Sequence, residues 1–307
     1  MTRAAADGPP VPDGPGPLEV WASRETVVGD TRVRRALPHR SRRTVGAWCF
    51  ADHMGPLAPD ATPTGIGPHP HTGLHTVTWL VEGEMLHRDS LGSEQILRPG
   101  QLNLMTAGQG VSHAEEPTAR GGGGGMHGIQ LWVAQPEATR HGPPAFEHHP
   151  SLPGVELGSA LATVLVGTLD GAASPARRDT DLVGLDVRLR RGAAELPVEP
   201  SFEHALVVLE GGVRVDGRPV VPGEGAYAGP GRHQLDLDST EGARLLVLGG
   251  APFESAVVMW WNFVGRTRQE VAEAGRQWND GADRFGDTGS PMARIPSPRP
   301  PWDPSRL

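Results

Sequence analysis

Two short pairs of side chains in the first half of the chain have the residue types and the spacing of metal ligands. His69 and His71 form the first pair, and His113 and Glu115 form the second. Successive side chains of an extended strand point to opposite faces, so the members of an i, i+2 pair point the same way. A lone histidine pair arises easily by chance in a chain with 13 histidines. A second pair of ligand type in the same unit makes a metal site the stronger interpretation.

The chemistry of these four donors narrows the choice of ion. Three imidazoles and one carboxylate suit a first-row divalent transition metal, whereas Mg²⁺ and Ca²⁺ favour oxygen ligands. Fe, Mn, Ni, Cu and Zn are all compatible with the set. Four protein ligands would saturate a tetrahedral Zn²⁺, while a six-coordinate Fe²⁺ would keep two positions for a substrate or for substrate and O₂. The ligand set alone leaves a metal-dependent isomerase or hydrolase open as well.

Other residues near the two pairs are expected to surround the ion rather than to bind it. His75 has the same parity as His69 and His71, but on a straight strand it is about 13 Å from His71 at about 3.3 Å per residue. We therefore expect it in the pocket wall, unless a bulge at Gly73 brings it closer. The further pocket-wall candidates are Met54, Trp79 and Met105, with core packing as the expected role of the last two. His127 is expected to be structural or to support a ligand.

Composition limits the class of protein. The chain has 307 residues, of which 42 are glycine, 31 are proline and 21% are charged, so a turn-rich β protein is expected. The net charge of −8 does not favour direct nucleic-acid binding, which needs a basic surface. Cys49 is the single cysteine, and neither an export signal nor a long apolar segment is present, so we expect no membrane association and a cytoplasmic protein.

Short strand-like runs repeat along two stretches of the chain with similar turns. Residues 209–212 (LEGG) correspond to 81–84 (VEGE), and residues 221–223 (VPG) correspond to 98–100 (RPG). This pattern predicts an internal duplication of one β-barrel, with metal ligands in the first copy alone. The expected organisation is a disordered tail at 1–17, a metal-binding domain at 18–135, a linker at 136–160, a second barrel domain without a metal site at 161–263, and a helix with a proline-rich tail at 264–307.

Several of these motifs together resemble the pirin family, bicupin proteins of the cupin superfamily. The matching segments include 50–56 (FADHMGP), 69–74 (HPHTGL), 105–108 (MTAG), 110–115 (GVSHAE), 127–132 (HGIQLW) and 261–263 (WNF). The resemblance implies an all-β bicupin of two face-to-face jelly-roll barrels, with an iron-type ion in the first. Carried over by residue, the ligands are His69, His71, His113 and Glu115, and the position near His75 is not used.

The resemblance implies two different functions. Some bacterial members resemble quercetin 2,3-dioxygenases, which open a flavonol ring with O₂ and release carbon monoxide, and an animal member is an iron-dependent transcriptional co-regulator. We expect an iron-dependent dioxygenase of a small aromatic substrate, with Glu115 as the catalytic base. The alternative is a regulatory protein whose iron state controls contact with a protein partner. A monomer is expected in either case.

Overall fold

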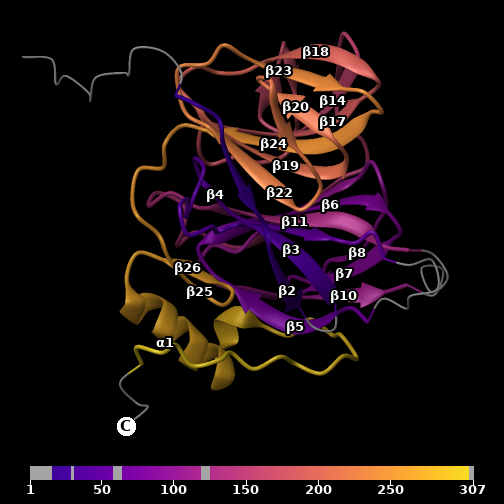
Figure 1. Ribbon diagram of the computed structural model, residues 1–307. Helices are drawn as coiled ribbons and strands as arrows, with labels where there is room; N and C mark the ends of the chain where they lie inside the picture. The colour runs from indigo at the N-terminus through magenta and orange to yellow at the C-terminus, as the bar shows by residue number, and fades with distance from the viewer. Residues whose placement is uncertain (1–15, 29–30, 58–63, 119–124, 304–307) are drawn as a thin grey trace, which may run out of the picture.

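The computed structural model describes residues 16–28, 31–57, 64–118 and 125–303. Most of the expected disordered tail at 1–17 lies outside the described residues, as do the last four residues of the chain. The described chain forms two stacked β units with a short helical segment at one end (Figure 1). None of its helices has the length and apolar character needed to cross a membrane.

The first β unit is a barrel made from a large and a small antiparallel sheet. The large sheet has the order β12-β9-β6-β11-β4-β3-β2 and the small one has the order β5-β10-β7-β8. The strands are β2 (Arg24–Val28), β3 (Thr31–Leu37), β4 (Trp48–Met54), β5 (Ile66–His71), β6 (Leu74–Glu82), β7 (Met85–Asp89), β8 (Glu94–Leu97), β9 (Leu102–Thr106), β10 (Val111–Pro117), β11 (His127–Ala134) and β12 (Ala145–His149).

The second unit repeats this plan. Its large sheet has the order β1-β22-β19-β24-β17-β14-β13, and its small sheet has the order β18-β23-β20-β21. The strands are β1 (Glu19–Ala22), β13 (Gly154–Leu157), β14 (Ala160–Val166), β17 (Leu182–Leu189), β18 (Gly192–Pro197), β19 (Glu203–Gly211), β20 (Val213–Val215), β21 (Arg218–Val220), β22 (Glu224–Ala228), β23 (Gln234–Ser239) and β24 (Ala243–Gly250), with a small hairpin of β15 (Thr168–Leu169) and β16 (Ala172–Ala173). The predicted duplication of one barrel is therefore confirmed.

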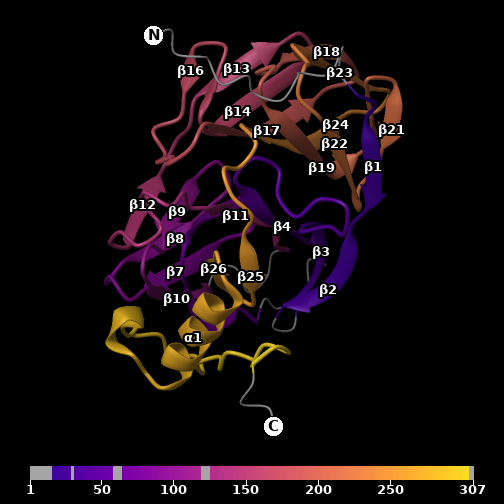
Figure 2. The same ribbon diagram turned by 90° about the vertical axis from the view of Figure 1, so that its left-hand side faces the viewer.

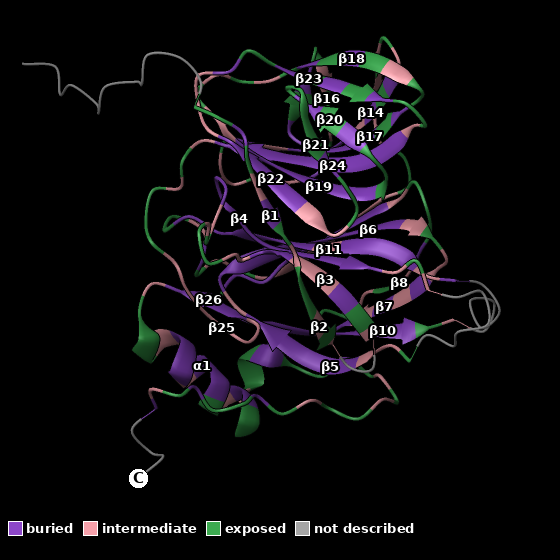
Figure 3. Cartoon of the chain, in the orientation of Figure 1, coloured by how far each residue is buried: buried purple, intermediate pink, exposed green. Residues whose placement is uncertain are grey.

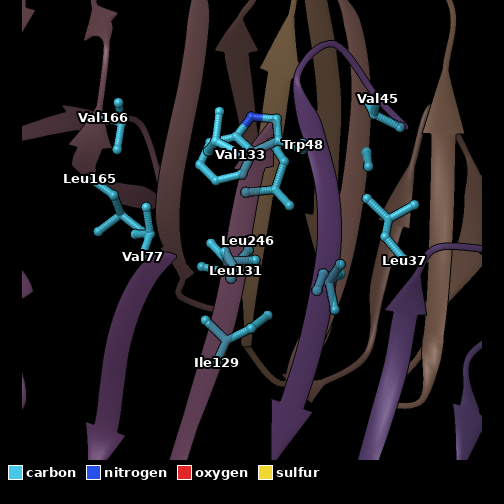
Figure 4. Packing of buried hydrophobic residues seen from close by; sticks show 14 of the residues in the cluster. Leu37, Val45, Trp48, Val77, Ile129, Leu131, Val133, Leu165, Val166 and Leu246 are labelled. Atoms are coloured by element: carbon cyan, nitrogen blue, oxygen red, sulfur yellow. The ribbon is translucent and has the colours of Figure 1, made fainter. Parts of the chain in front are cut away.

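The two large sheets pack face to face, and their facing side chains form the main hydrophobic core. Val77, Ile129 and Leu131 from the first unit meet Leu165 and Leu246 from the second (Figure 4). The strands β6, β11 and β24, which carry several of these residues, are purple along most of their length when the chain is coloured by burial (Figure 3). Burial of a leucine- or valine-sized side chain stabilises a fold by about 1.5–3 kcal/mol, so this layer holds the two units together.

Each end of the described chain crosses to the other unit. β1 pairs with β22 in the large sheet of the second unit, and Glu19 lies opposite Tyr227. The C-terminal segment returns to the first unit, where β25 (Val258–Trp260) and β26 (Phe263–Gly265) form a hairpin beside β5, with a bridge between Phe263 and Thr72. Both crossings are visible when the molecule is turned (Figure 2).

The C-terminal helix α1 (Arg268–Asn279) covers the outer end of the first barrel. Thr267 caps it, because its hydroxyl accepts a hydrogen bond from the backbone N–H of Glu270. Val271, Ala274 and Trp278 recur at helical spacing and pack on Phe263 of β26 and on Phe285 of the short 3₁₀ helix η2 (Asp283–Phe285). The predicted helix is present, and it fixes the segment that touches the histidine-bearing strands.

Candidate metal centre

Three imidazoles converge inside the first barrel. β5 and β10 are antiparallel neighbours, with His69 opposite His113 and His71 opposite Val111. One nitrogen from each of His69, His71 and His113 lies within 4.8 Å of the others. The Nε2 atoms of His71 and His113 are 3.1 Å apart. Two ligands bound at about 2.1 Å and at right angles on one ion would be about 3.0 Å apart, so this spacing fits shared coordination.

The ring nitrogens are in the form that binds a metal. Burial lowers the pKa of His69 to about 4 and holds the pKa values of His71 and His113 well below the ordinary value, so all three rings are neutral near pH 7. Nδ1 of His69 donates to the carbonyl oxygen of Gly67 at 2.9 Å. Because a carbonyl can only accept, the lone pair of His69 is on Nε2.

The C-terminal segment secures the turn that leads into β10. The Ser112 hydroxyl donates to the backbone oxygen of Phe285 at 2.8 Å. Gly110 has a φ of 153°, and a Cβ there would lie 3.3 Å from Phe285. The turn before His113 therefore closes against η2 and leaves little space for a side chain at position 110.

Glu115 lies near the three histidines but outside their group of mutually close donor atoms. It is buried on β10, and it lines the same cavity as His69, His71 and His113. The register between β10 and β5 shifts after His113, so Glu115 is not presented to β5 as the simple i, i+2 pattern predicts. Its assignment as the fourth ligand therefore stays a prediction.

The donor set fits a bound cation. Burial raises the pKa of Glu115 to about 7, and no arginine or lysine forms an ion pair with it among the described residues. A buried carboxyl without a counter-charge and three neutral imidazoles whose nitrogens face one another are all stabilised by a divalent ion between them. The residues that would hold such an ion are His69, His71 and His113, with Glu115 as the predicted fourth.

His87 is a site residue that the sequence reasoning did not single out. It lies on β7 beside His113, with 3.4 Å between the two Nδ1 atoms, and it stacks on Phe146. Its Nε2 donates to Asp89 at 3.1 Å, and the other oxygen of Asp89 accepts from the backbone N–H groups of Leu91 and Ser93. The sequence does contain a pattern that could have identified His87: His87 and Asp89 form another pair at i, i+2 spacing.

These contacts define a line of hydrogen bonds that orients His113. The Nε2–H of His87 donates to Asp89, so the Nδ1 of His87 accepts a hydrogen bond from the Nδ1–H of His113. The Nε2 lone pair of His113 is then free to bind a metal. Asp89→Asn is expected to lower metal affinity about 10–100-fold, because such supporting contacts fix the ligand tautomer. Competitive titration with a chelator measures this, with the exposed carboxyl change Glu94→Gln as the matched control. Equal affinities in the two variants would contradict the role of Asp89.

His75 is not in the pocket wall, and that prediction is wrong. Gly73 adopts a φ of 69° at the point where the chain leaves the small sheet and enters β6 of the large sheet, so the parity of β5 does not continue. On β6, His75 shares a face with Val77 and Trp79, which pack toward the second unit. Its ring bonds to the Thr106 hydroxyl at 2.9 Å and to the Asp179 carboxylate at 3.1 Å.

Asp179 joins the two units at this point. Besides His75 it accepts from Thr139 at 2.5 Å, from Arg177 at 2.8 Å and from Gln135 at 3.3 Å. Burial alone would raise the pKa of Asp179, but the hydrogen bonds from His75, Arg177 and Thr139 outweigh it and hold the pKa below its ordinary value. A carboxyl group whose pKa is lower in the folded than in the unfolded state stabilises the fold at pH values above its unfolded-state pKa, which is about 3.9 for aspartate. This contribution is lost as the pH falls through the folded-state pKa.

Asp179→Asn is expected to lower the free energy of unfolding at pH 7 by about 1–3 kcal/mol, because it removes the charge that several buried donors share. Urea unfolding followed by tryptophan fluorescence measures the change. Asp181→Asn is the matched control, since the side chain of Asp181 is 79% exposed and its contact with Arg178 is 3.4 Å long. A loss of the same size in both variants would contradict a joining role for Asp179.

The remaining candidates lie in three different environments. Met54 lines the cavity, while Trp79 and Met105 are in hydrophobic cores. His127 is buried away from the histidine cluster, where its Nε2 lies 2.7 Å from that of His53 and its Nδ1 lies 3.1 Å from Glu210 of the second unit.

The cavity above the histidines has a volume of about 560 Å³ and reaches exposed residues of β2. Its wall beside the histidines is aromatic. Trp132 meets His71 edge-on at 5.2 Å and stacks on Phe50 at 3.9 Å with an interplanar angle of 12°. Volumes of about 300–1,000 Å³ with mostly apolar walls are typical of small-molecule sites.

Two fused β-barrels with a histidine cluster inside the first define a bicupin with a candidate metal site. The pirin family model matches residues 30–133, and the model of the pirin C-terminal cupin domain matches residues 184–286. The chain is 44% identical over 290 residues to a Pseudomonas aeruginosa protein provisionally named quercetin 2,3-dioxygenase, an alignment that covers 92% of this chain and 90% of that protein. The chain belongs to the pirin family.

Other comparisons agree. A pirin-like protein of Caulobacter vibrioides is 36% identical over 276 residues, which is 87% of this chain and 95% of that protein. A crystal structure described as quercetin 2,3-dioxygenase from Acinetobacter baumannii superposes with a TM-score of 0.89 at 40% identity, covering 93% of this chain and 96% of that one. The expected bicupin fold is thus confirmed.

Proposed function

We propose that the protein is an iron-dependent dioxygenase of flavonol- or catechol-like small molecules. One observation carries the proposal: three neutral, buried imidazoles and a buried carboxyl group lie in one cavity that is large enough for an aromatic ligand. Relatives and a solved structure named for quercetin 2,3-dioxygenase activity support the choice of substrate class.

His69, His71, His113 and Glu115 are the residues that would hold the metal. A bound iron ion would supply a Lewis acid and a template for the substrate oxygens and O₂. Three imidazoles hold the site without titrating near neutral pH, because burial keeps their pKa values far below 7.

Glu115 is the proposed general base. Burial raises the pKa of Glu115 to about 7 when no metal is bound, and a bound cation would lower it, so that the carboxylate is ionised and able to accept a proton. In this role its carboxylate takes the proton of the substrate hydroxyl, so that the substrate binds as an anion. The stacked rings of Phe50 and Trp132 would form an apolar wall beside the substrate and keep water away from it.

Oxygen uptake with quercetin tests the proposal. Protein freed of metal with a chelator is reloaded with Fe, Mn, Ni, Cu or Zn in separate samples, and O₂ consumption is followed for each. We expect the iron-loaded sample to be the most active and the metal-free sample to be inactive. The absence of O₂ uptake with every flavonol and catechol tried, in samples shown to contain the metal, would refute it.

The regulatory alternative stays a prediction. The large apolar side chains that are exposed in the described residues lie in separate parts of the chain: Val27 on β2, Leu161 on β14, and Leu91 and Val221 outside the strands. The described surface therefore offers no specific feature that favours a protein partner over a small substrate.

A further inference from the structure

The lining of the cavity includes arginine side chains that are not in ion pairs with any described residue. It includes four carboxylates and three arginines. Three of the carboxylates are in ion pairs with arginine: Asp52 with Arg35, Glu84 with Arg98, and Glu116 with Arg88. Arg24 and Arg43 also line the cavity and form no ion pair with any described residue. With Glu115 committed to the metal cation, these two are the lining guanidinium groups without an ion pair in the described part of the chain, although the charge of Arg24 also acts on the Asp52 carboxylate.

The strand register explains how Arg24 reaches the cavity. Arg24 lies opposite Arg35 on β3, Arg35 lies opposite Asp52 on β4, and Asp52 lies opposite Gln130 on β11. Cross-strand partners point to the same face of a sheet, so these four polar side chains form a row on the cavity side. The row leads from half-buried Gln130 through buried Asp52 to the exposed edge strand at Arg24.

A continuous apolar surface connects this row with the proposed metal. His71 contacts Trp132, Trp132 stacks on Phe50, and the guanidinium carbon of Arg35 lies 4.5 Å from the centre of the Phe50 ring. Phe50 is stacked between Trp132 and Arg35, so a planar molecule with oxygens on the metal would pass the edges of these rings and extend toward the arginines. Beside them, the Nε2 of Gln130 is a buried donor with no partner among the described residues, placed to bind an oxygen on such a molecule.

We propose that the cavity selects a planar aromatic substrate that carries an anionic group, such as a carboxylate, at the end remote from the metal. The inference rests on the proposed function in one respect, that the other end of the substrate binds the metal through oxygen. Arg24 and Arg43 supply the charge, the edges of Phe50 and Trp132 supply an apolar wall, and Gln130 donates to an oxygen of the substrate between the metal and the arginines. Guanidinium groups suit this task because they remain charged and bind carboxylates through two parallel hydrogen bonds.

Ligand binding without turnover tests the proposal. The iron-loaded protein is titrated under anaerobic conditions with 3-hydroxyflavone and with its 4′-carboxylate, and tryptophan fluorescence reports occupancy. The carboxylate is expected to bind about five- to tenfold more tightly, and the difference should shrink as salt is added. Equal affinities of the two ligands in wild-type protein would overturn the proposal.

Three variants assign the charge to the named arginines. Arg24→Gln and Arg43→Gln are each expected to weaken binding of the carboxylate about two- to fivefold and to leave 3-hydroxyflavone nearly unchanged. Arg32→Gln is the matched control, because Arg32 is exposed on β3 but alternates to the other face and does not line the cavity. An equal loss in all three variants would show a general charge effect and would overturn the assignment.

The two proposals fail in different ways. A preference for the carboxylate without O₂ consumption would leave the binding inference standing and remove the dioxygenase. Equal binding of both ligands with normal O₂ consumption would leave the dioxygenase standing and remove the binding inference.

Discussion

His113→Ala is expected to lose the bound metal while the fold is retained, with affinity reduced at least about 100-fold. The reason is that His113 is the shared neighbour in the cluster: its ring centre lies 4.3 Å from that of His69 and 5.0 Å from that of His71. Loss of a direct ligand should exceed the 10–100-fold cost of losing a supporting contact. Elemental analysis of the purified variant measures the metal, and circular dichroism reports the fold.

His148→Ala is the matched control for this change. His148 is a half-buried histidine of the same barrel that bonds to Asn103 at 2.8 Å and does not line the cavity. It should keep the wild-type metal content. Unchanged metal content in His113→Ala would contradict the ligand assignment, and equal losses in both variants would point to a general disturbance of the barrel.

Glu115→Gln is expected to reduce the rate of O₂ consumption with quercetin about 10²–10⁴-fold, even at metal concentrations that restore occupancy. The amide keeps the size of the side chain but cannot take a proton, and a well-placed general base contributes a factor of this order. Rates at saturating quercetin, normalised to measured metal, separate this effect from weaker metal binding. A variant with the wild-type rate per metal would exclude Glu115 as the base.

The same variant tests the pH dependence of metal binding. Because the pKa of Glu115 is about 7 without metal, the carboxyl is protonated below that pH and must release a proton to face a cation. Metal affinity should therefore fall about tenfold per pH unit as pH decreases from 7 toward 5, and level off above 7. In Glu115→Gln the profile should be flat over this range, since His69 titrates only at about 4.

The sequence was sufficient for the features that depend on local spacing. The His69/His71 pair and His113 are brought together because each pair of strands alternates faces, and β5 and β10 are neighbours as facing ligand pairs require. The repeated turns revealed the duplicated barrel, and proline, glycine and β-branched patterns revealed its strands. These inferences need no knowledge of which sheet a strand joins.

Features that depend on which sheet a strand joins could not be predicted from the sequence. His75 shares its parity with His69 and His71 in the linear chain, but Gly73 lies in the turn after β5, and the next strand belongs to another sheet. The four residues of β1 have the pattern of an edge strand in either unit, so their pairing with β22 does not follow from their composition. The row from Arg24 to Gln130 depends on four strands whose register is set by tertiary packing.

The most direct test of the proposed activity is the amount of carbon monoxide released by the iron-loaded protein with quercetin under air. Ring opening by a dioxygenase predicts that carbon monoxide, consumed O₂ and consumed quercetin appear in equal amounts, and that all three stop when the metal is removed. Quercetin loss without carbon monoxide, or at the same rate in metal-free protein, would contradict a metal-dependent dioxygenase.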